Sequence, residues 1–186
     1  MLVDLFGVPG WSFDTTTLDA ANVLLGRYHY LGPTTRGQAY AGHLDGVLAA
    51  VQVWRAPSSR HLPSDGTWLE LSRWCLTPYA GPNAGSRQHG AFVRWVRLHR
   101  PDVTTLVSYS DPSQGHTGAL YKACNWQWAP TWQRLFTPPT GNGSWDGGRT
   151  MQAAKDRWVF VLRPDPRRAE VLRVKDGRYV EPSGSS

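Results

Sequence analysis

Polar side chains that can accept, donate or orient protons gather in one short stretch between residues 108 and 121. Asp111 supplies a carboxylate and Tyr121 a phenol, two groups that can take part in general acid–base chemistry. Further polar residues lie around them: Ser108, Tyr109, Ser110, His116 and Thr117. A purely structural connection rarely needs so many polar groups, so this stretch predicts a functional site.

Each of these residues also has a structural interpretation. Asp111 precedes a proline and could cap a turn, and Tyr121 could be a buried tyrosine with a satisfied hydroxyl. His116 lies in a Gly-His-Thr-Gly turn, where a capping or orienting role fits better than metal ligation. The sequence has no HxH, HxxxH or HxxE spacing, so we predict no metal site; an iron site built from His29, Asp111 and a tyrosine is the weaker alternative.

Residues outside this stretch add to the predicted site. Strand alternation places Arg73 on an apolar face with Leu69, Leu71 and Cys75, where an arginine needs a partner or lines a cleft. It could clamp a phosphate or a carbonyl, or pair with Asp111.

The start of the second helix and the end of the first supply the other candidates. Ser86, at the start of a helix, is a ligand contact or an N-cap only. His29 and Tyr30 either contribute to the site or fill the end of the first helix.

The elements that must position these residues follow from periodicity and turn signals. A helix is predicted from Thr16 to Arg27, with Thr15, Thr16 or Thr17 as its N-cap. Asp45-Gly46 is a hairpin signal, and it joins two predicted strands at 38–44 and 46–54. Trp68–Leu76 predicts a third strand, and a second helix runs to about His99.

The second half of the chain predicts a crossover followed by further strands. A buried strand at 103–107 leads through the polar turn into a short helix bearing Ala119, Leu120, Ala123 and Cys124. Strands are then expected at 127–136 and 157–163, with a terminal hairpin at 171–180 and disorder at 182–186. We therefore expect one catalytic domain at 1–163 and a C-terminal extension at 164–186, with an α+β architecture.

Composition narrows the class of protein. Net charge is +6, and nearly all of the basic residues are arginines. This excess indicates either a nucleic-acid partner or a GC-rich genome that encodes arginine in place of lysine. Ten tryptophans include candidates to stack on flat ligands: Trp54, Trp68, Trp126, Trp128 and Trp132. Arg87, Arg94 and Arg97 share a helix face that could bind phosphates or be only solvated. With neither a signal peptide nor a long apolar run, we expect a soluble cytoplasmic protein without a membrane partner.

The order of elements resembles the Gcn5-related N-acetyltransferase (GNAT) fold, in which two central strands splay apart to form a cleft. Within that class, five segments resemble the phage Mom family of DNA adenine modification proteins: HYLG at 29–32, LELSRWCL at 69–76, NAGS at 83–86, SYSD at 108–111 and GHTGALYKACNW at 115–126. The resemblance covers residues 16–136 and implies a phage-encoded enzyme in a bacterial host. It would place a carbamoylmethyl or acetamido-type group on adenine N6 and so protect DNA from restriction.

The resemblance also implies residue roles. The family's functional arginine, serine, aspartate and tyrosine fall on Arg73, Ser86, Asp111 and Tyr121, and its His-Tyr pair on His29 and Tyr30. Ser108, Tyr109, His116 and Trp126 are predicted to contact the substrate or the donor. Double-stranded DNA with a flipped-out adenine is the predicted partner, and a dimer is one predicted assembly.

The donor stays open. Acetyl-CoA or another acyl or aminoacyl donor fits the reaction, but the run from Asn83 to Gly90 lacks the glycine spacing with which acetyltransferases of this fold hold the coenzyme A pyrophosphate. Two alternatives remain: an ordinary acyl-CoA-dependent N-acyltransferase acting on a small molecule or a protein, and a nucleic-acid-binding module without catalysis.

Overall fold

The computed structural model describes residues 10–129, 135–136, 150–151 and 155–166. The elements follow in this order: β1 (Trp11–Thr16), α1 (Leu18–Tyr28), β2 (Gln38–Leu44), β3 (Val47–Arg55), β4 (Trp68–Leu76), α2 (Ala84–His99), β5 (Thr105–Ser110), the 3-10 turn η1 (Pro112–Gln114), α3 (Ala119–Ala123), β6 (Gln127–Ala129), β7 (Leu135–Phe136), β8 (Thr150–Met151) and β9 (Asp156–Val161). The predicted hairpin at 171–180 and tail at 182–186 lie outside the described residues. No helix in the described ranges is long and apolar enough to cross a membrane.

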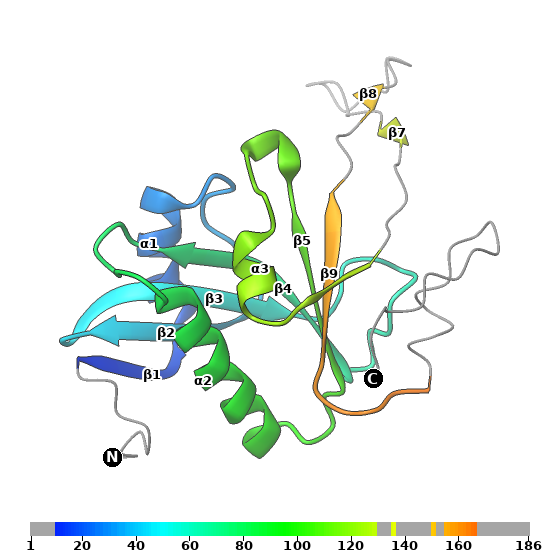
Figure 1. The fold of residues 1–186 in the computed structure, drawn as a ribbon, viewed down its shortest axis with the longest axis horizontal. Helices are drawn as coiled ribbons and strands as arrows, with labels where there is room; N and C mark the ends of the chain where they lie inside the picture. Colours follow the sequence, from blue (N-terminus) through cyan, green and yellow to red (C-terminus); the bar gives the residue numbers. More distant parts are fainter. Residues whose placement is uncertain (1–9, 130–134, 137–149, 152–154, 167–186) are drawn as a thin grey trace.

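A seven-stranded sheet in the order β1-β2-β3-β4-β5-β9-β6 organises the molecule (Figure 1). Neighbouring strands from β1 to β4 are antiparallel, β4 and β5 are parallel, and β9 lies antiparallel between β5 and β6. β7 and β8 form a separate pair. The predicted α+β class, with a mixed and mostly antiparallel sheet, is confirmed.

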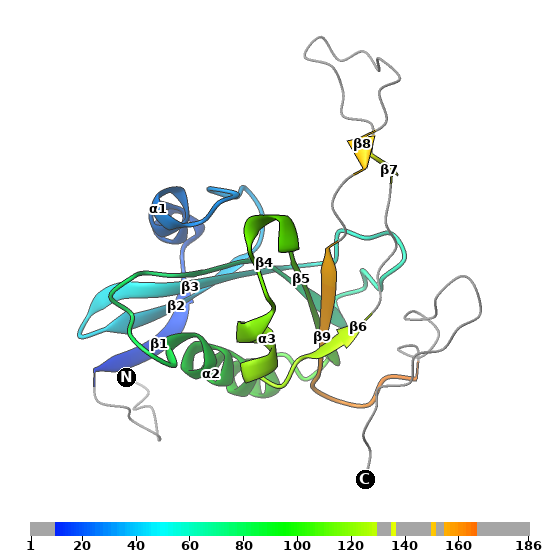
Figure 2. The same ribbon diagram turned by 45° about the horizontal axis from the view of Figure 1, so that its top comes forward.

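The helices cover both faces of the sheet, with α1 on one side and α2 and α3 on the other (Figure 2). On the α1 face, Leu24 and Leu25 pack against Val51, Val53 and Cys75. A fully buried leucine contributes about 2 kcal/mol by leaving water, so this contact holds α1, and the loop that follows it, in place.

The α2 face carries an aromatic core. Phe92 and Val96 of α2 pack with Trp54 of β3, Leu71 of β4 and Leu106 of β5, and the rings of Trp54 and Phe92 stack 4.1 Å apart. The two side chains from β4 and β5 fix the middle of the sheet against α2.

The edges of the predicted elements differ from the observed ones in three places. β1 was not predicted as a strand; it is an edge strand that pairs with β2 alone. α1 begins at Leu18 instead of Thr16, and its N-cap is Thr17, one of the three predicted, whose Oγ1 accepts the Ala20 N–H at 3.2 Å. The continuous strand predicted at 127–136 is wrong, because β6 belongs to the main sheet and β7 to the separate pair.

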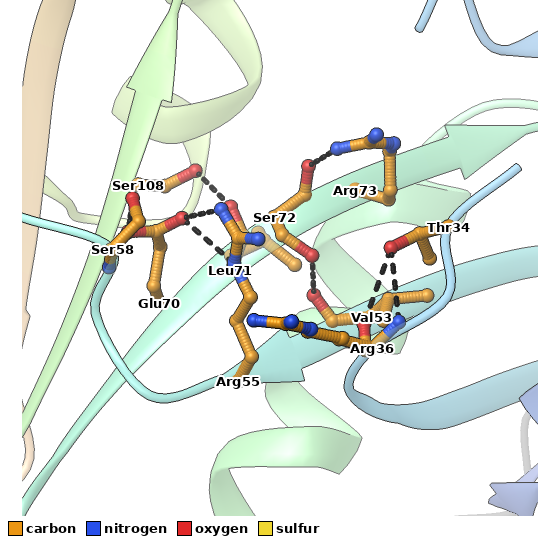
Figure 3. A network of polar contacts seen from close by, with 10 residues as sticks. All are labelled: Thr34, Arg36, Val53, Arg55, Ser58, Glu70, Leu71, Ser72, Arg73 and Ser108. Carbon is orange, nitrogen blue, oxygen red and sulfur yellow. Dashed lines mark hydrogen bonds and ion pairs between the residues drawn. The ribbon is translucent and has the colours of Figure 1, made fainter. Parts of the chain in front are cut away.

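A β-bulge in β4 changes which face its later residues occupy. Val53 pairs with Arg73 and Trp54 with Leu71, so Ser72 has no opposite residue; its Oγ instead donates to the Val53 carbonyl at 3.0 Å (Figure 3). The extra residue shifts the alternation by one. Leu71 and Trp74 therefore share the α2 face, and Arg73 joins Cys75 on the α1 face.

This bulge corrects part of the predicted alternation. The sequence grouped Arg73 with Leu69 and Leu71, but these leucines lie on the other face. A strict period of two holds only in an unbroken ladder, so one unpaired residue reverses the assignment beyond it.

β4 and β5 diverge where the site is predicted. Their parallel pairing runs from Trp68 and Thr105 to Leu71 and Ser108 and then ends, although β4 continues to Leu76. Ser108 Oγ donates to the Leu71 carbonyl at 3.0 Å, at the last paired position. The predicted splaying of the two central strands is confirmed.

Candidate active site

The end of α1 contacts the loop between β5 and α3. His29, the C-cap residue of α1, stacks on Tyr30 with ring centroids 5.0 Å apart. Tyr30 in turn meets the His116 ring edge-on at 5.1 Å. Three aromatic rings from two distant segments therefore form one wall of the site, and Tyr30, 45% exposed, is within reach of a ligand.

His29 is a neutral imidazole in this arrangement. Burial, followed by the charges of Arg73 and His116, lowers the pKa of His29 to about 4. Its Nδ1 accepts the Leu31 N–H at 3.2 Å, so the proton of the neutral ring is on Nε2. His29 can therefore donate one hydrogen bond at neutral pH.

Arg73 points to the loop after α1. Its Nε donates to the Gly32 carbonyl at 3.2 Å and one terminal nitrogen donates to the Ser72 carbonyl at 2.8 Å. Burial and the nearby charge of Arg55 lower the pKa of Arg73 from its ordinary value. The two hydrogen bonds go to carbonyl oxygens, which orient the guanidinium without neutralising its charge.

Asp111 follows β5 and caps the next turn, as its structural interpretation predicts. Its Oδ1 accepts the Ser113 N–H at 3.1 Å and the Ser113 hydroxyl, and its Oδ2 lies 3.8 Å from Lys155 Nζ. These hydrogen bonds from Ser113, which outweigh partial burial, lower the pKa of Asp111. The group is a carboxylate at neutral pH; its ion pair is with Lys155, and the predicted pairing with Arg73 is not the contact observed.

Tyr121 of α3 faces Ser108 across the diverging strands. Their hydroxyl oxygens lie 2.9 Å apart. Because the single Ser108 hydroxyl proton is donated to the Leu71 carbonyl, Tyr121 is the donor in this pair. Burial raises the pKa of Tyr121 to about 12, so the phenol keeps its proton at neutral pH.

Tyr30 connects the two sides of the site electrostatically. Its pKa is raised by burial and by the charge of Asp111, while Arg73 opposes that change. Tyr30 also contributes to the raised pKa of Tyr121. The predicted residues thus gather at the splayed end of β4 and β5, where the Asp111 N–H donates to His116 Nδ1 at 3.4 Å and His116 meets Tyr30. They are His29, Tyr30, Arg73, Ser108, Asp111, His116 and Tyr121.

Three further predicted residues make other contacts, although the Trp126 ring also meets Tyr121 edge-on at 5.5 Å. Ser86 is the third residue of α2, not its N-cap, which is Asn83; its Oγ donates to the Asn83 carbonyl at 3.0 Å. Tyr109 points to the opposite face of β5 from Ser108, against the cluster of Leu62 and Trp68. Trp126 is 4% exposed and donates its Nε1–H to His89 Nε2 at 3.2 Å, which places it in the core.

The other stacking candidates divide between core and surface. Trp54 and Trp68 are buried, whereas Trp128 is 53% exposed and donates to Asp156. Position 132 lies outside the described residues. Arg87, Arg94 and Arg97 are exposed on α2, as predicted, but α2 covers the face of the sheet opposite α1.

Sequence reasoning missed the rings that hold Tyr121. Trp158 of β9 stacks on Tyr121 at 5.3 Å, and Trp74 meets it edge-on at 5.8 Å. Trp158 also donates its Nε1–H to Ser110 Oγ at 2.9 Å. β9 follows β6 in the chain but inserts beside β5, and no local pattern reveals that insertion. Lys155, beside Asp111, was missed for the same reason.

Solved structures similar to this chain include acetyltransferases. A putative acetyltransferase from Salmonella typhimurium, with its cofactor acetyl-CoA, superimposes with a TM-score of 0.57 at 10% identity, over 85% of this chain and 97% of that one. The ribosomal-protein-S18-alanine N-acetyltransferase from Escherichia coli gives 0.54 at 16% identity over the same shares. A GNAT family acetyltransferase from Elizabethkingia anophelis with acetyl-CoA bound gives 0.56 at 13% identity, over 82% and 98%. The predicted GNAT-like fold is confirmed.

The start of α2 does not fit the coenzyme A cradle expected of that fold. The glycine spacing is absent, and a Cβ on Gly85 would lie 2.5 Å from Leu120 Cδ1 and 3.2 Å from Leu76 Cδ1. Side chains of α3 and β4 therefore pack directly on the first turn of α2. Trp74 adds to this packing by donating to Gln88 Oε1 at 3.1 Å. In the described residues, no three His, Cys, Asp or Glu side chains are grouped to hold a metal.

The comparisons of sequence give the family. The methylcarbamoylase mom of Escherichia phage Mu is 29% identical over 116 residues, which are 61% of this chain and 47% of that protein. The match therefore spans about half the length of this relative. The model of the Mom protein family matches residues 10–184, which include every strand and helix described above. This chain belongs to the Mom protein family.

Proposed function

We propose that this chain modifies the N6 amine of adenine in DNA with a carbamoylmethyl or acetamido-type group, as a phage-encoded defence against restriction. The observation that carries the proposal is the cluster of Tyr30, Arg73, Asp111 and Tyr121 at the splayed strands, where His116 contacts both the Tyr30 ring and the Asp111 N–H. Membership of the Mom family, and a relative named methylcarbamoylase, support the type of reaction.

Asp111 orients the attacking amine. Adenine N6 is a poor nucleophile because its lone pair is delocalised into the ring, so it must be held in line and lose a proton as the new bond forms. The Asp111 carboxylate accepts a hydrogen bond from N6. The amine becomes strongly acidic as its bond to carbon forms, so a carboxylate of lowered pKa suffices to take its proton.

Tyr121 and Arg73 act on the donor. Tyr121 is a protonated phenol with a raised pKa, and its hydroxyl can turn from Ser108 to hydrogen-bond a developing oxyanion or to protonate a leaving group. Arg73 supplies a positive charge oriented by two carbonyls. His29 and His116 fix Tyr30 between them, and the exposed Tyr30 ring offers a surface for a flipped base. The start of α2 does not fit coenzyme A, so the proposed reaction does not use it.

Restriction cleavage of plasmid DNA from expressing cells tests the proposal. Plasmid from cells that make the wild-type chain should resist restriction enzymes whose sites contain adenine. Plasmid from cells that make Asp111→Ala should be cut like that of the empty vector. Equal resistance with Asp111→Ala would contradict the assigned role, and full cutting of the wild-type plasmid would contradict the function.

The alternative function, an ordinary acyl-CoA-dependent N-acyltransferase, predicts a different result. A chain that uses acetyl-CoA should be stabilised by it, since a ligand at 100 times its Kd raises stability by about 2.7 kcal/mol. We expect no shift of the melting temperature with acetyl-CoA, and a clear shift would favour that alternative.

A further inference from the structure

Three arginines lie at one end of the α1 face, next to Tyr30 and Asp111. Arg55 ends β3 and pairs with Glu70 of β4, and Arg73 is close enough to Arg55 for the two charges to interact. Arg36 comes from the loop before β2 and precedes Gln38, which pairs with Trp54, the neighbour of Arg55. Figure 3 shows the three side chains over the same region of the sheet. We call Arg36, Arg55 and Arg73 the arginine surface.

Glu70 is the carboxylate that pairs with this surface, and both of its oxygens already accept hydrogen bonds (Figure 3). Glu70 Oε1 accepts from Arg55 Nε at 3.1 Å and from its terminal nitrogen at 2.6 Å. Glu70 Oε2 accepts from the Ser58 N–H and hydroxyl, both at 2.8 Å. Three guanidinium groups therefore face one paired carboxylate, and the arginine surface keeps an excess of positive charge.

The arginines of this surface are more exposed to solvent than the carboxylate that pairs with them. The Glu70 side chain is 4% exposed, whereas that of Arg55 is 33% exposed and Arg36 is exposed. Arg73 is held half-buried by carbonyl oxygens next to a second guanidinium. Like charges this close repel one another, and a bound anion removes that repulsion. Arginine forks match the paired oxygens of a phosphate.

The position of the surface selects its ligand. It adjoins Tyr30 and Asp111, where the proposed function places the target adenine, whereas the arginines of α2 lie on the other side of the sheet (Figure 2). Resting on that proposed function, we infer that the two outer arginines of this surface, Arg36 and Arg55, bind the phosphodiesters of the DNA strand that flank the flipped adenine, while Arg73 faces the donor. Contacts of this kind set the position of a strand and carry no base specificity.

Binding of labelled duplex DNA at several salt concentrations tests this inference. Each lost phosphate contact should reduce the slope of log affinity against log salt by about 0.9. Arg36→Glu should weaken binding and make this slope shallower by at least that amount. Lys122→Glu makes the same change of charge on α3, away from the surface, and should leave the slope unchanged; Lys122 is exposed there.

The outcomes separate this surface from its alternatives. Loss of binding in Arg97→Glu with full binding in Arg36→Glu would overturn the inference and assign DNA to α2. Full DNA affinity in Arg36→Glu together with lost modification would also overturn it, because the anion would then be a phosphate of the donor. If the wild type protects plasmid DNA and Arg36→Glu binds normally, the inference fails while the proposed function stands. A wild type that neither protects nor binds DNA contradicts both.

Discussion

At the scale of single residues, the site depends on two hydroxyls whose hydrogen bonds have a fixed direction. Ser108 donates to Leu71 and accepts from Tyr121. The Tyr121 proton therefore points at Ser108 Oγ, at the last paired position of β4 and β5, beyond which the two strands diverge. The ring is held by Trp158 and Trp74, so removal of its hydroxyl should change chemistry more than packing.

Tyr121→Phe should therefore lose modification by a factor of about 10² or more, as expected for a removed general acid or oxyanion donor. Its free energy of unfolding should fall by about 1 kcal/mol, for one hydrogen bond. Tyr79→Phe is the matched control, because Tyr79 also makes one hydrogen bond, to the Leu48 carbonyl at 2.8 Å, far from the cluster. Plasmid modification and urea unfolding measure the two effects, and equal activity of both variants would remove Tyr121 from the mechanism.

At the scale of elements, α3 can lie close to β9 because the residue that precedes it, Gly118, has no side chain. Gly118, the N-cap of α3, has φ +72°, and a Cβ there would lie 2.1 Å from the Trp158 ring. That ring is buried and stacks on Tyr121, so it has little room to move. The position of Tyr121 in the site thus depends on a close approach that only glycine allows.

Gly118→Ala should lower the free energy of unfolding by about 2 kcal/mol or more, since it combines left-handed strain with overpacking. Gly115→Ala is the control: its φ is +74°, but a Cβ would meet nothing within 4 Å. It should cost only the left-handed strain of about 1 kcal/mol. Chemical denaturation of both variants makes the comparison, and similar losses would show that contact with Trp158 is unimportant.

The elements were largely predictable from local patterns, and the site only partly. Asp45-Gly46 located the hairpin of β2 and β3 because a two-residue turn sets the register by itself. The bulge at Ser72 was not predictable, since it depends on the pairing partner and not on the local sequence. Arg73 was therefore predicted on the same face as Leu69 and Leu71, which lie on the other face, and its role in the site stays a prediction. The predicted end of the domain at 163 stays a prediction, although Asp165 accepts a hydrogen bond from Trp68.

At the scale of the whole molecule, stability should depend on pH through a buried histidine. His89 is 3% exposed, and burial lowers its pKa to about 4. The folded chain therefore keeps this ring neutral where the unfolded chain, with an ordinary pKa of 6.5, is protonated. Its contribution is complete above pH 6.5 and is lost as the pH falls towards 4.

We expect the free energy of unfolding to fall by a few kcal/mol between pH 7 and pH 4, since each pKa unit corresponds to about 1.4 kcal/mol. His89→Gln should flatten the profile, because a glutamine oxygen can accept the Trp126 N–H without titrating. The slope that remains should come from His29, whose pKa is lowered in the same direction. Urea unfolding across this pH range measures the free energy of unfolding of both chains. A His89→Gln profile parallel to that of the wild type would show that His89 does not cause the pH dependence.

The most direct test of the central claim is mass spectrometry of nucleosides from plasmid DNA of expressing cells. We predict a new deoxyadenosine that carries the added group on N6, and its loss in Asp111→Ala and Tyr121→Phe. Both variants must be folded and expressed like the wild type for the comparison. Unmodified deoxyadenosine from the folded wild-type chain, or a new nucleoside that persists in both variants, would contradict the account.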